Sequence, residues 1–460
     1  MATRIYHYNT HAEKRYFLGP QHHGLYDMIA LNGNIVSNTP EGVAGFLATA
    51  GKDFYIDPQT HAFQHPTIHL KRDISDKEAG EPPQYEFKPS IEKLATERLK
   101  GPFADVIQND RPIRLTAFLD GSNNIRNDVI NLVCERVGYF QLYTMLVELD
   151  DEAKELIGDM SRLRPKFLIA PYFCLATPLW REWFKINVAC YRRTRELFKD
   201  LPIYFGLVLS QDRLNDRDEI IEALSLVKPD GILLWIDEYV EEMLGGSEIG
   251  SYVNFLQGLK QVTDTTYNSH GGYLSILLCH SEVRGLLDGV GHAMNYGEHR
   301  AIVPIGGGLP MAQFYLLSVH SRLRYADAAS IIQPKGWLNS VEQYRENICR
   351  CHQCQELLKE KGGAETAFAE YGKSNPVTIT RRSGTIVRLE YPTKEAKQAA
   401  TRHYLYNKAK EFENIEEKNF RELLLELNNT YNAISSDAGE DFVGHLFTWH
   451  EALGGLLKAE

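Results

Sequence analysis

Short apolar runs recur through the first three quarters of the chain and alternate with segments of helical spacing. Most of these runs are continuously apolar, which is typical of strands in a parallel sheet covered by helices on both faces. The runs with strand character are MIALNGNIV, FYIDP, RLTAFLD, KFLIAPYF, IYFGLVLS, GILLWID, YLSILLCH, AIVPIG and AASII. Between them, RDEIIEALSLV places Ile220, Leu224 and Val227 on one helical face. The alternation predicts an α/β fold.

The nine candidate strands are close in number to the eight of a (β/α)8 TIM-type barrel with one accessory strand. An open doubly wound sheet is the alternative, but no GxGxxG motif opens a helix after a strand. We therefore expect a barrel catalytic domain over residues 1–340. The polar segment that contains Pro82 and Pro83 predicts an excursion from the sheet around residues 70–110.

The pattern changes after residue 340, where CRCHQC brings Cys349, Cys351 and Cys354 together. Three thiolates with CxCxxC spacing can reach one Zn²⁺ at about 2.3 Å, and a fourth ligand completes the tetrahedron. His403 is the better candidate because a helix can hold its imidazole against the cysteines, whereas His352 lies inside the knuckle. A closed set of four ligands predicts a structural zinc; the alternative is three incidental cysteines with a redox role.

The remainder of the C-terminal region is predicted to be a hairpin and helices. VTITRRSGTIVRLEY, residues 377–391, has the pattern of a hairpin that turns at Ser383 and Gly384. A helix-like run extends from about residue 395 to residue 428, and a short helix comes after residue 437. Residues 341–460 are therefore expected to form a zinc-binding and helical subdomain with a hairpin insertion.

Composition and charge favour a cytoplasmic protein over a membrane or secreted protein, and they argue against a uniformly basic surface. The chain has 460 residues and a net charge of −11, and it contains no apolar run near the roughly 18 residues of a membrane span. The N-terminus lacks the apolar core of a signal peptide, and the other cysteines are scattered, so we expect a cytoplasmic protein. The negative charge excludes a uniformly basic surface, but Arg322, Arg324, Arg381 and Arg382 form local clusters that are candidates for phosphate contacts.

The cysteine motif, followed by a histidine on a helix and placed after a barrel, resembles the zinc subdomain of the tRNA-guanine transglycosylase superfamily. The resemblance extends to two acids. In FYIDPQTHAFQ, Asp57 takes the place of the family's base-site aspartate, with Phe63 near the base. In AIVPIGGGLPMAQFYLLSVHSRLRYADAAS, which contains Gly307, Asp327 takes the place of the nucleophile in the last barrel strand. The resemblance implies an enzyme that exchanges guanine in a nucleic acid for another base.

Further positions match the family in part, and others depart from it. Gln211 in LVLSQDR and the pair Gly297 and Glu298 in MNYGEHR are partial counterparts of substrate-binding motifs. The loop after Asp57 is Pro-Gln-Thr and lacks the family's glycines, and 48 residues separate Cys354 from the histidine ligand, about twice the usual family gap. These departures resemble the DpdA-type branch, which modifies DNA with 7-deazaguanine bases.

This resemblance implies a double displacement at C1′ of the sugar. Asp327 would attack C1′ and hold the nucleotide covalently, and Asp57 would manage protons on the leaving and entering bases. The expected partners are DNA, a 7-deazaguanine such as preQ0 and a protein that helps to load the nucleic acid. One alternative keeps this chemistry but uses tRNA. Another is a catalytically silent, zinc-stabilised relative that only binds nucleic acid.

Overall fold

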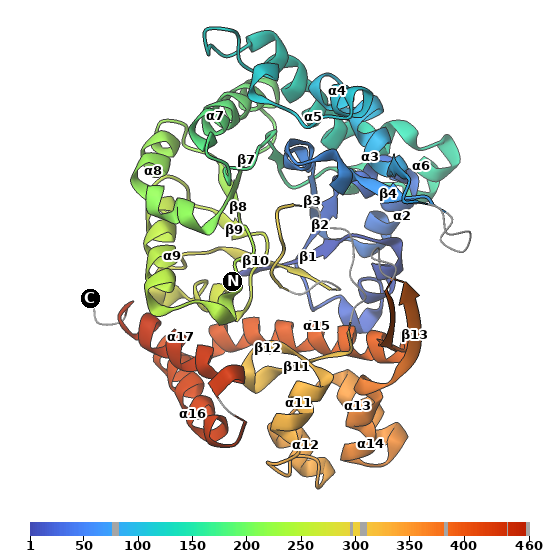
Figure 1. Ribbon diagram of the computed structural model, residues 1–460, viewed down its shortest axis with the longest axis vertical. Helices are drawn as coiled ribbons and strands as arrows, with labels where there is room; N and C mark the ends of the chain where they lie inside the picture. The colour runs from blue at the N-terminus through green and yellow to red at the C-terminus, as the bar shows by residue number, and fades with distance from the viewer. Residues whose placement is uncertain (76–81, 295–297, 304–310, 381–384, 439, 457–460) are drawn as a thin grey trace.

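Eight parallel strands form one sheet that curls into a nearly closed barrel in the computed structural model (Figure 1). The structure describes residues 1–75, 82–294, 298–303, 311–380, 385–438 and 440–456. The two edge strands of the sheet, β3 and β6, approach each other: the backbone N–H of Lys166, just before β6, donates to the carbonyl of Phe54 on β3 at 2.8 Å. In spatial order the strands are β3 (Asp53–Asp57), β2 (Met28–Asn32), β1 (Thr3–Tyr8), β10 (Gly289–Ala293), β9 (Thr266–Asn268), β8 (Gly231–Ile236), β7 (Ile203–Leu209) and β6 (Leu168–Ile169).

Both faces of the sheet are buried, which explains the continuously apolar sequences of β7 and β8. On β3, Phe54 and Ile56 belong to the core shared with the surrounding helices, whereas Tyr55 belongs to the core inside the barrel. The same alternation on β8 sends Leu233 and Trp235 inward. Because successive side chains of a strand point to opposite faces, the two cores are separated by the sheet itself.

Three of the predicted strands are wrong. RLTAFLD forms a short 3₁₀ turn at Leu115–Ala117, YLSILLCH begins with helix α10 (Tyr273–Leu277), and AASII lies in helix α11 (Tyr325–Ile332). AIVPIG contains no strand in its described part, and its remainder lies outside the described residues. The periodicity of a short apolar run does not distinguish a strand from a buried helix. The prediction also missed three strands, β1, β9 and β10, because they contain polar residues and do not form apolar runs.

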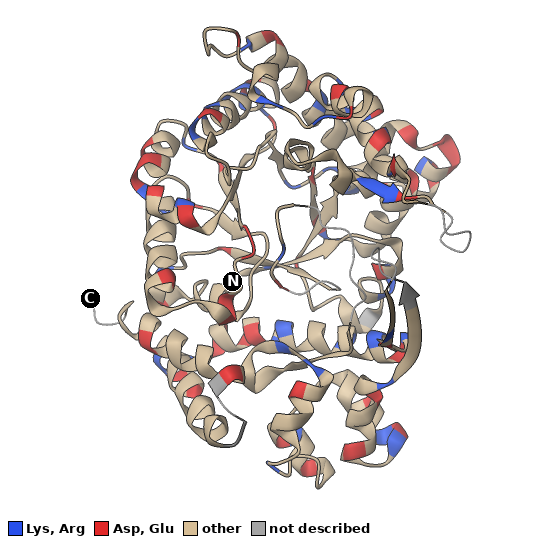
Figure 2. Ribbon diagram, in the orientation of Figure 1, with Lys and Arg blue, Asp and Glu red and all other residues tan. Residues whose placement is uncertain are grey.

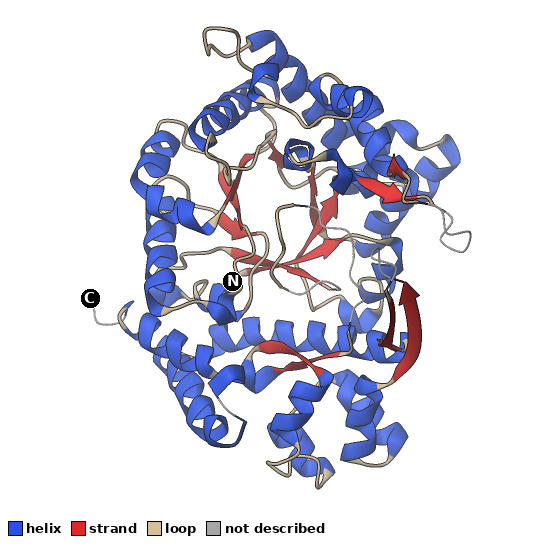
Figure 3. Cartoon of the chain, viewed as in Figure 1, coloured by secondary structure: helices blue, strands red, loops and turns tan. Residues whose placement is uncertain are grey.

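Helices surround the barrel on its outer side (Figure 3). The predicted excursion is confirmed as an antiparallel pair of short strands, β4 (Lys71–Asp73) and β5 (Tyr85–Phe87), followed by two helices. The helices of the barrel region are α1 (Gly33–Asn38), α2 (Pro40–Ala50), α3 (Pro89–Lys93), α4 (Pro102–Asn109), α5 (Asn127–Glu148), α6 (Asp151–Ile157), α7 (Trp180–Leu197), α8 (Arg217–Ser225) and α9 (Gly246–Leu259). Charged residues lie mainly on these helices and on loops, while the strands carry few (Figure 2).

The C-terminal region contains two hairpins and a set of helices. Its elements are β11 (Gln313–Leu316), β12 (Ser321–Arg324), α11, α12 (Val341–Asn347), α13 (His352–Lys361), α14 (Ala364–Ala369), β13 (Ser374–Thr380), β14 (Ile386–Pro392), α15 (Lys394–Glu417), α16 (Phe420–Ala438) and α17 (Gly444–Gly454). The predicted hairpin is confirmed as β13 and β14, although its turn lies outside the described residues. The predicted long helix is two helices, because the chain leaves helical geometry at Lys418.

Helix α15 lies along the side of the barrel formed by β1 and β10 (Figure 1). The hydroxyl of Tyr6 on β1 donates to the carbonyl of Leu405 at 3.4 Å, and the ring of His292 on β10 contacts Phe412 with 5.8 Å between centroids. A helix of the C-terminal region therefore covers β1 and β10, which are the first and the last barrel strands along the sequence. Among the described helices, none combines the length and apolar character needed to cross a membrane.

Candidate active site and metal centre

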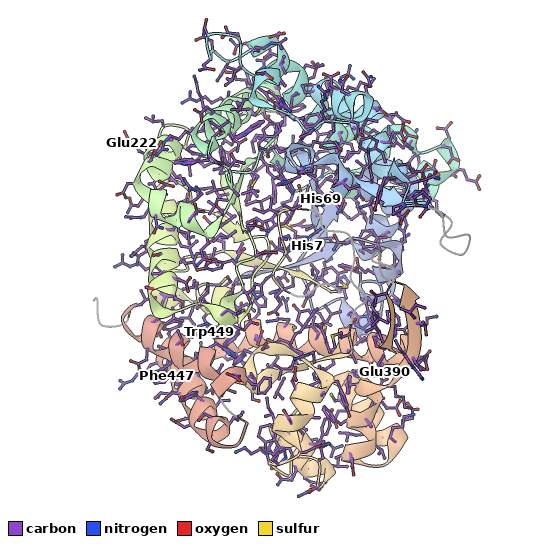
Figure 4. All side chains as sticks on the ribbon, in the orientation of Figure 1. His7, His69, Glu222, Glu390, Phe447 and Trp449 are labelled. Carbon is purple, nitrogen blue, oxygen red and sulfur yellow. The ribbon has the colours of Figure 1, made fainter. Side chains whose placement is uncertain are left out.

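The inward-facing rows of the barrel end in a polar layer at the carboxyl ends of the strands. Side chains alternate along a strand, so Asp57 continues the inward row of Tyr55 on β3, and Asp237 continues that of Trp235 just after β8. His7 has the same inward position near the end of β1 and lies within the ring of strands in Figure 4. Active sites of parallel α/β barrels collect at this end of the strands.

Asp57 is held by two hydrogen bonds. The hydroxyl of Tyr172 donates to its Oδ1 at 2.6 Å, and the backbone N–H of Gln59 donates to the same oxygen at 2.9 Å. Burial raises the pKa of Asp57 above its usual value, although the Tyr172 hydrogen bond opposes this effect. His61 stacks on Tyr172 with 5.2 Å between ring centroids, and Trp235 meets His61 edge-on at 5.1 Å. Asp57 is therefore a carboxyl biased towards its protonated form beside aromatic rings.

Asp237 is fixed by the segment of residues 298–303, which lies over the barrel mouth. The backbone N–H of Ile302 donates to Asp237 Oδ1 at 2.7 Å, and the indole N–H of Trp235 donates to the carbonyl of Arg300 at 3.0 Å. Ile302 itself is buried in the core inside the barrel. This contact fixes the orientation of the Asp237 carboxyl group at the barrel mouth.

A cavity of about 380 Å³ opens between this segment and the loops after β1, β2 and β3. Its size is within the range of small-molecule sites. Its lining combines apolar residues such as Leu70, Ile91 and Val303 with a polar and aromatic set, which is Asn9, Asn32, Gln59, His61, Trp235, His299 and Arg300. The indole ring of Trp235, together with amide and cationic groups, suits a heterocyclic ligand that is both stacked and hydrogen-bonded.

Three cysteines and a histidine meet in the C-terminal region as the spacing predicted. Cys349, Cys351, Cys354 and His403 each offer a ligand atom, and these atoms all lie within 4.8 Å of one another. The Nδ1 atom of His403 lies 3.5 Å from Cys351 Sγ and 3.3 Å from Cys354 Sγ. The edges of a tetrahedron around a metal with such ligands measure about 3.5–3.8 Å. The group can therefore bind a metal ion with little rearrangement.

A second layer of contacts orients the cluster. His403 Nε2 lies 2.7 Å from the carbonyl oxygen of Tyr315, which directs Nδ1 towards the thiols. The hydroxyls of Tyr344 and Tyr371 lie 3.3 and 3.2 Å from Cys354 Sγ. His403 and Cys354 are fully buried. A closed, buried set of four ligands leaves no position for a substrate, which is typical of a structural site.

The predicted position of Asp327 is wrong. It lies in the first turn of α11, outside the barrel, where Arg324 Nε donates to its Oδ2 at 2.8 Å. The last barrel strand is β10, which ends at Ala293, and the residues between it and α11 include the separate hairpin of β11 and β12. The prediction fails here because AASII, expected to be a strand, lies in a helix. Among the described residues, no contact joins Asp327 to Asp57.

Among the described residues, Phe63, Gln211 and Arg322, which were predicted to contact substrate or phosphate, contact other parts of the protein. Phe63 is fully buried and packs on Phe103 at 5.3 Å, so it belongs to the core and does not line the cavity. Gln211 comes after β7 but donates to Glu248 Oε1 at 2.6 Å. Arg322 lies 3.5 Å above the ring of Tyr404 and donates to the carbonyl of Ala293. Arg324 is exposed, and Gly297, Gly307, Arg381 and Arg382 lie outside the described residues.

Glu298 is part of a buried ionic cluster between the barrel and α15. Lys408 Nζ lies 2.6 Å from Glu298 Oε1 and 2.8 Å from Glu411 Oε2, and all three side chains are buried. Burial alone would raise the pKa of Glu411, but Lys408 and His320 hold it below its usual value. The pKa of Glu298 is raised, because burial outweighs the attraction of Lys408.

No protein-family model matches this chain, and no curated protein matches it in a sequence search. The functional argument therefore depends on the residues themselves. Sequence reasoning missed Asp237, which comes directly after the apolar run GILLWI. The sequence contains the pattern that identifies it: Asp237 lies two positions after Trp235, and residues two apart on a strand point to the same face of the sheet.

Proposed function

We propose that this protein exchanges guanine in DNA for a 7-deazaguanine base such as preQ0, within a (β/α)8 barrel that a structural zinc site supports. The observation that carries the proposal is the pair of carboxyl groups at the ends of barrel strands, Asp57 and Asp237, which accept hydrogen bonds from Gln59 and Ile302, two residues that line the cavity at the barrel mouth. The Cys₃His cluster that comes after the barrel supports the resemblance to base-exchanging transglycosylases. Its donor set suits Zn²⁺.

The two carboxyl groups suit different steps of a double displacement. Ionised Asp237 attacks C1′ of the deoxyribose, the C1′–N9 bond breaks, and the departing guanine receives a proton from Asp57. The entering base then gives its N9 proton to Asp57 and attacks C1′, which releases Asp237. Burial of Asp57 suits it to carry the proton, and the hydrogen bond from the backbone N–H of Ile302 holds the Asp237 carboxyl group in place. Two inversions predict net retention at C1′.

A base inside a duplex cannot reach this cavity, so the target nucleotide must be flipped out or single-stranded. The hairpin of β13 and β14 lies in the long interval between Cys354 and His403, and Arg388 on it is exposed. A two-stranded ribbon of this size can contact the phosphate backbone beside the flipped nucleotide. We assign the preference for DNA over tRNA to this insertion.

The test incubates the full-length protein with labelled guanine or preQ0 and with either DNA or tRNA. Incorporation into DNA, abolished by Asp237→Asn and by Asp57→Asn but retained by Asp327→Asn, is the expected result. Asp327→Asn is the matched control because it makes the same chemical change outside the barrel. Incorporation into tRNA alone would assign the same chemistry to the other nucleic acid, and activity lost only in Asp327→Asn would refute the assignment of Asp237.

The position of Asp327 favours one second candidate. If the barrel had kept its scaffold and lost its nucleophile, the protein would bind nucleic acid without base exchange. In that case no labelled base enters either nucleic acid, while a mobility shift with DNA persists in Asp57→Asn and Asp237→Asn alike. Loss of that shift on salt addition would identify phosphate contacts as the source of binding.

A further inference from the structure

A second group of potential metal ligands lies at the barrel mouth, away from the cysteines. Glu242 belongs to the loop after β8, and Glu298 and His299 belong to the loop after β10. One ligand atom from each lies within 4.8 Å of the others. Glu242 Oε2 is 2.9 Å from His299 Nε2, which is close to the edge of a coordination polyhedron with bonds of about 2.1 Å.

The second observation is a buried oxygen without a donor. Glu298 is 3% exposed, and its Oε1 accepts from Lys408 and from the hydroxyl of Tyr404. Its Oε2 has no hydrogen-bond partner within the described part of the chain. An unsatisfied buried acceptor costs about 1–3 kcal/mol, and more when it is charged. A cation at this point would remove that cost.

The backbone also leaves room for the carboxylates. A Cβ atom at Gly272, after β9, would lie 2.9 Å from Glu241 Oε2 and 3.0 Å from Glu298 Oε2. Any larger residue would push these acidic groups apart. Three successive barrel loops thus converge on one small region that contains Glu241, Glu242 and Glu298, and Lys408 is the buried cation that lies against Glu298.

We infer that Glu242, Glu298 and His299 bind a divalent cation of the Mn²⁺, Fe²⁺ or Zn²⁺ class. Two carboxylates and one imidazole are ligands that these ions commonly bind, whereas thiolates such as those of the cysteine cluster prefer softer metal ions. Three protein ligands leave coordination positions open, and His299 also lines the cavity at the barrel mouth. The inference does not depend on base exchange, because it concerns ligand geometry alone.

The experiment titrates Mn²⁺ into the full-length protein after dialysis against citrate, which removes weakly held ions and leaves thiolate-bound zinc. Electron paramagnetic resonance of free Mn²⁺ reports binding, and one saturable equivalent is expected. Glu242→Gln and Glu298→Gln should each weaken binding by at least about 10- to 100-fold. The exposed Glu238→Gln, in the same loop, is the matched control and should bind as the unaltered protein does.

Two results would overturn the inference. One is the lack of saturable binding of Mn²⁺, Fe²⁺ or Zn²⁺ at this second site in the unaltered protein, a readout that does not depend on any variant folding. The other is Mn²⁺ binding that survives both glutamine variants or disappears only with Cys351→Ser, because either pattern would assign the ion elsewhere. Thermal melts of each variant identify any loss of binding that comes from unfolding.

Discussion

Removal of the Lys408 ammonium tests the buried ionic cluster that joins α15 to the barrel. In Lys408→Met, the aliphatic part of the side chain remains but the partner of Glu298 and Glu411 is lost. Glu411 retains contacts with His320 at 2.6 Å and with the hydroxyl of Tyr315, whereas Glu298 keeps only the Tyr404 hydroxyl as a donor within the described residues. Breaking a buried pair in this way costs about 3–5 kcal/mol.

Helix α15 supplies its own control. Lys410, two positions further on, pairs with Glu413 and Glu417 at the surface, where all three side chains are about half exposed. Lys410→Met should therefore cost at most about 1 kcal/mol. Urea titration followed by circular dichroism gives the free energy of unfolding of each variant. If Lys408→Met costs no more than Lys410→Met, the cluster does not stabilise the fold as described.

The pH dependence of the same variant has a definite sign. Without Lys408, burial raises the folded-state pKa values of Glu298 and Glu411 above the unfolded value, so protonation stabilises the folded state. The penalty of Lys408→Met should then be larger at pH 8 than at pH 5.5. Adding Glu298→Gln to Lys408→Met should recover part of the loss, because a neutral amide replaces one orphaned carboxylate. A penalty that does not change with pH would contradict this reasoning.

The two sites give three further expected outcomes. Cys351→Ser, or a strong chelator, should remove about one equivalent of metal and lower the melting temperature by several degrees, because the cluster ties the knuckle to α15; equal stability and equal metal content would exclude a structural metal there. Asp57→Asn should reduce base exchange about 10²- to 10⁴-fold with an unchanged melting curve, measured by label incorporation. If protonated Asp57 supplies the proton, the exchange rate of the unaltered protein should fall as the pH rises through the raised pKa of Asp57. A rate that instead rises with pH would indicate that Asp57 acts as a base.

The sequence predicted the metal cluster better than it predicted the barrel. CxCxxC is a local pattern, and a histidine on a long helix is a strong second signal, so Cys349, Cys351, Cys354 and His403 were correct as a group. The barrel strands were less certain because β9 and β10 contain Asn268 and His292 within short runs. Polar residues in a strand hide it from a search for apolar runs.

The candidate acids show the same division. Asp57 was recognisable because it ends a short apolar run, and the structure has it at the end of β3. Asp327 was assigned by its order before the cysteines, and order along the chain does not tell whether a segment belongs to the barrel or to the C-terminal region. Asp237 required the register of β8, since only the inward orientation of Trp235 identifies its neighbour two positions on.

Helix α15 links the two parts of the molecule through one face. His403 of the metal cluster, Asn407 beside it, and Lys408 and Glu411 of the ionic cluster are all buried on this helix. Lys408 in turn contacts Glu298, the first residue of the segment 298–303 that fixes Asp237. A change that displaces α15 is therefore expected to act on the barrel mouth through Glu298. Loss of the metal should for this reason lower base exchange at temperatures where the protein is still folded, and it should do so in Cys351→Ser without altering Asp57 or Asp237.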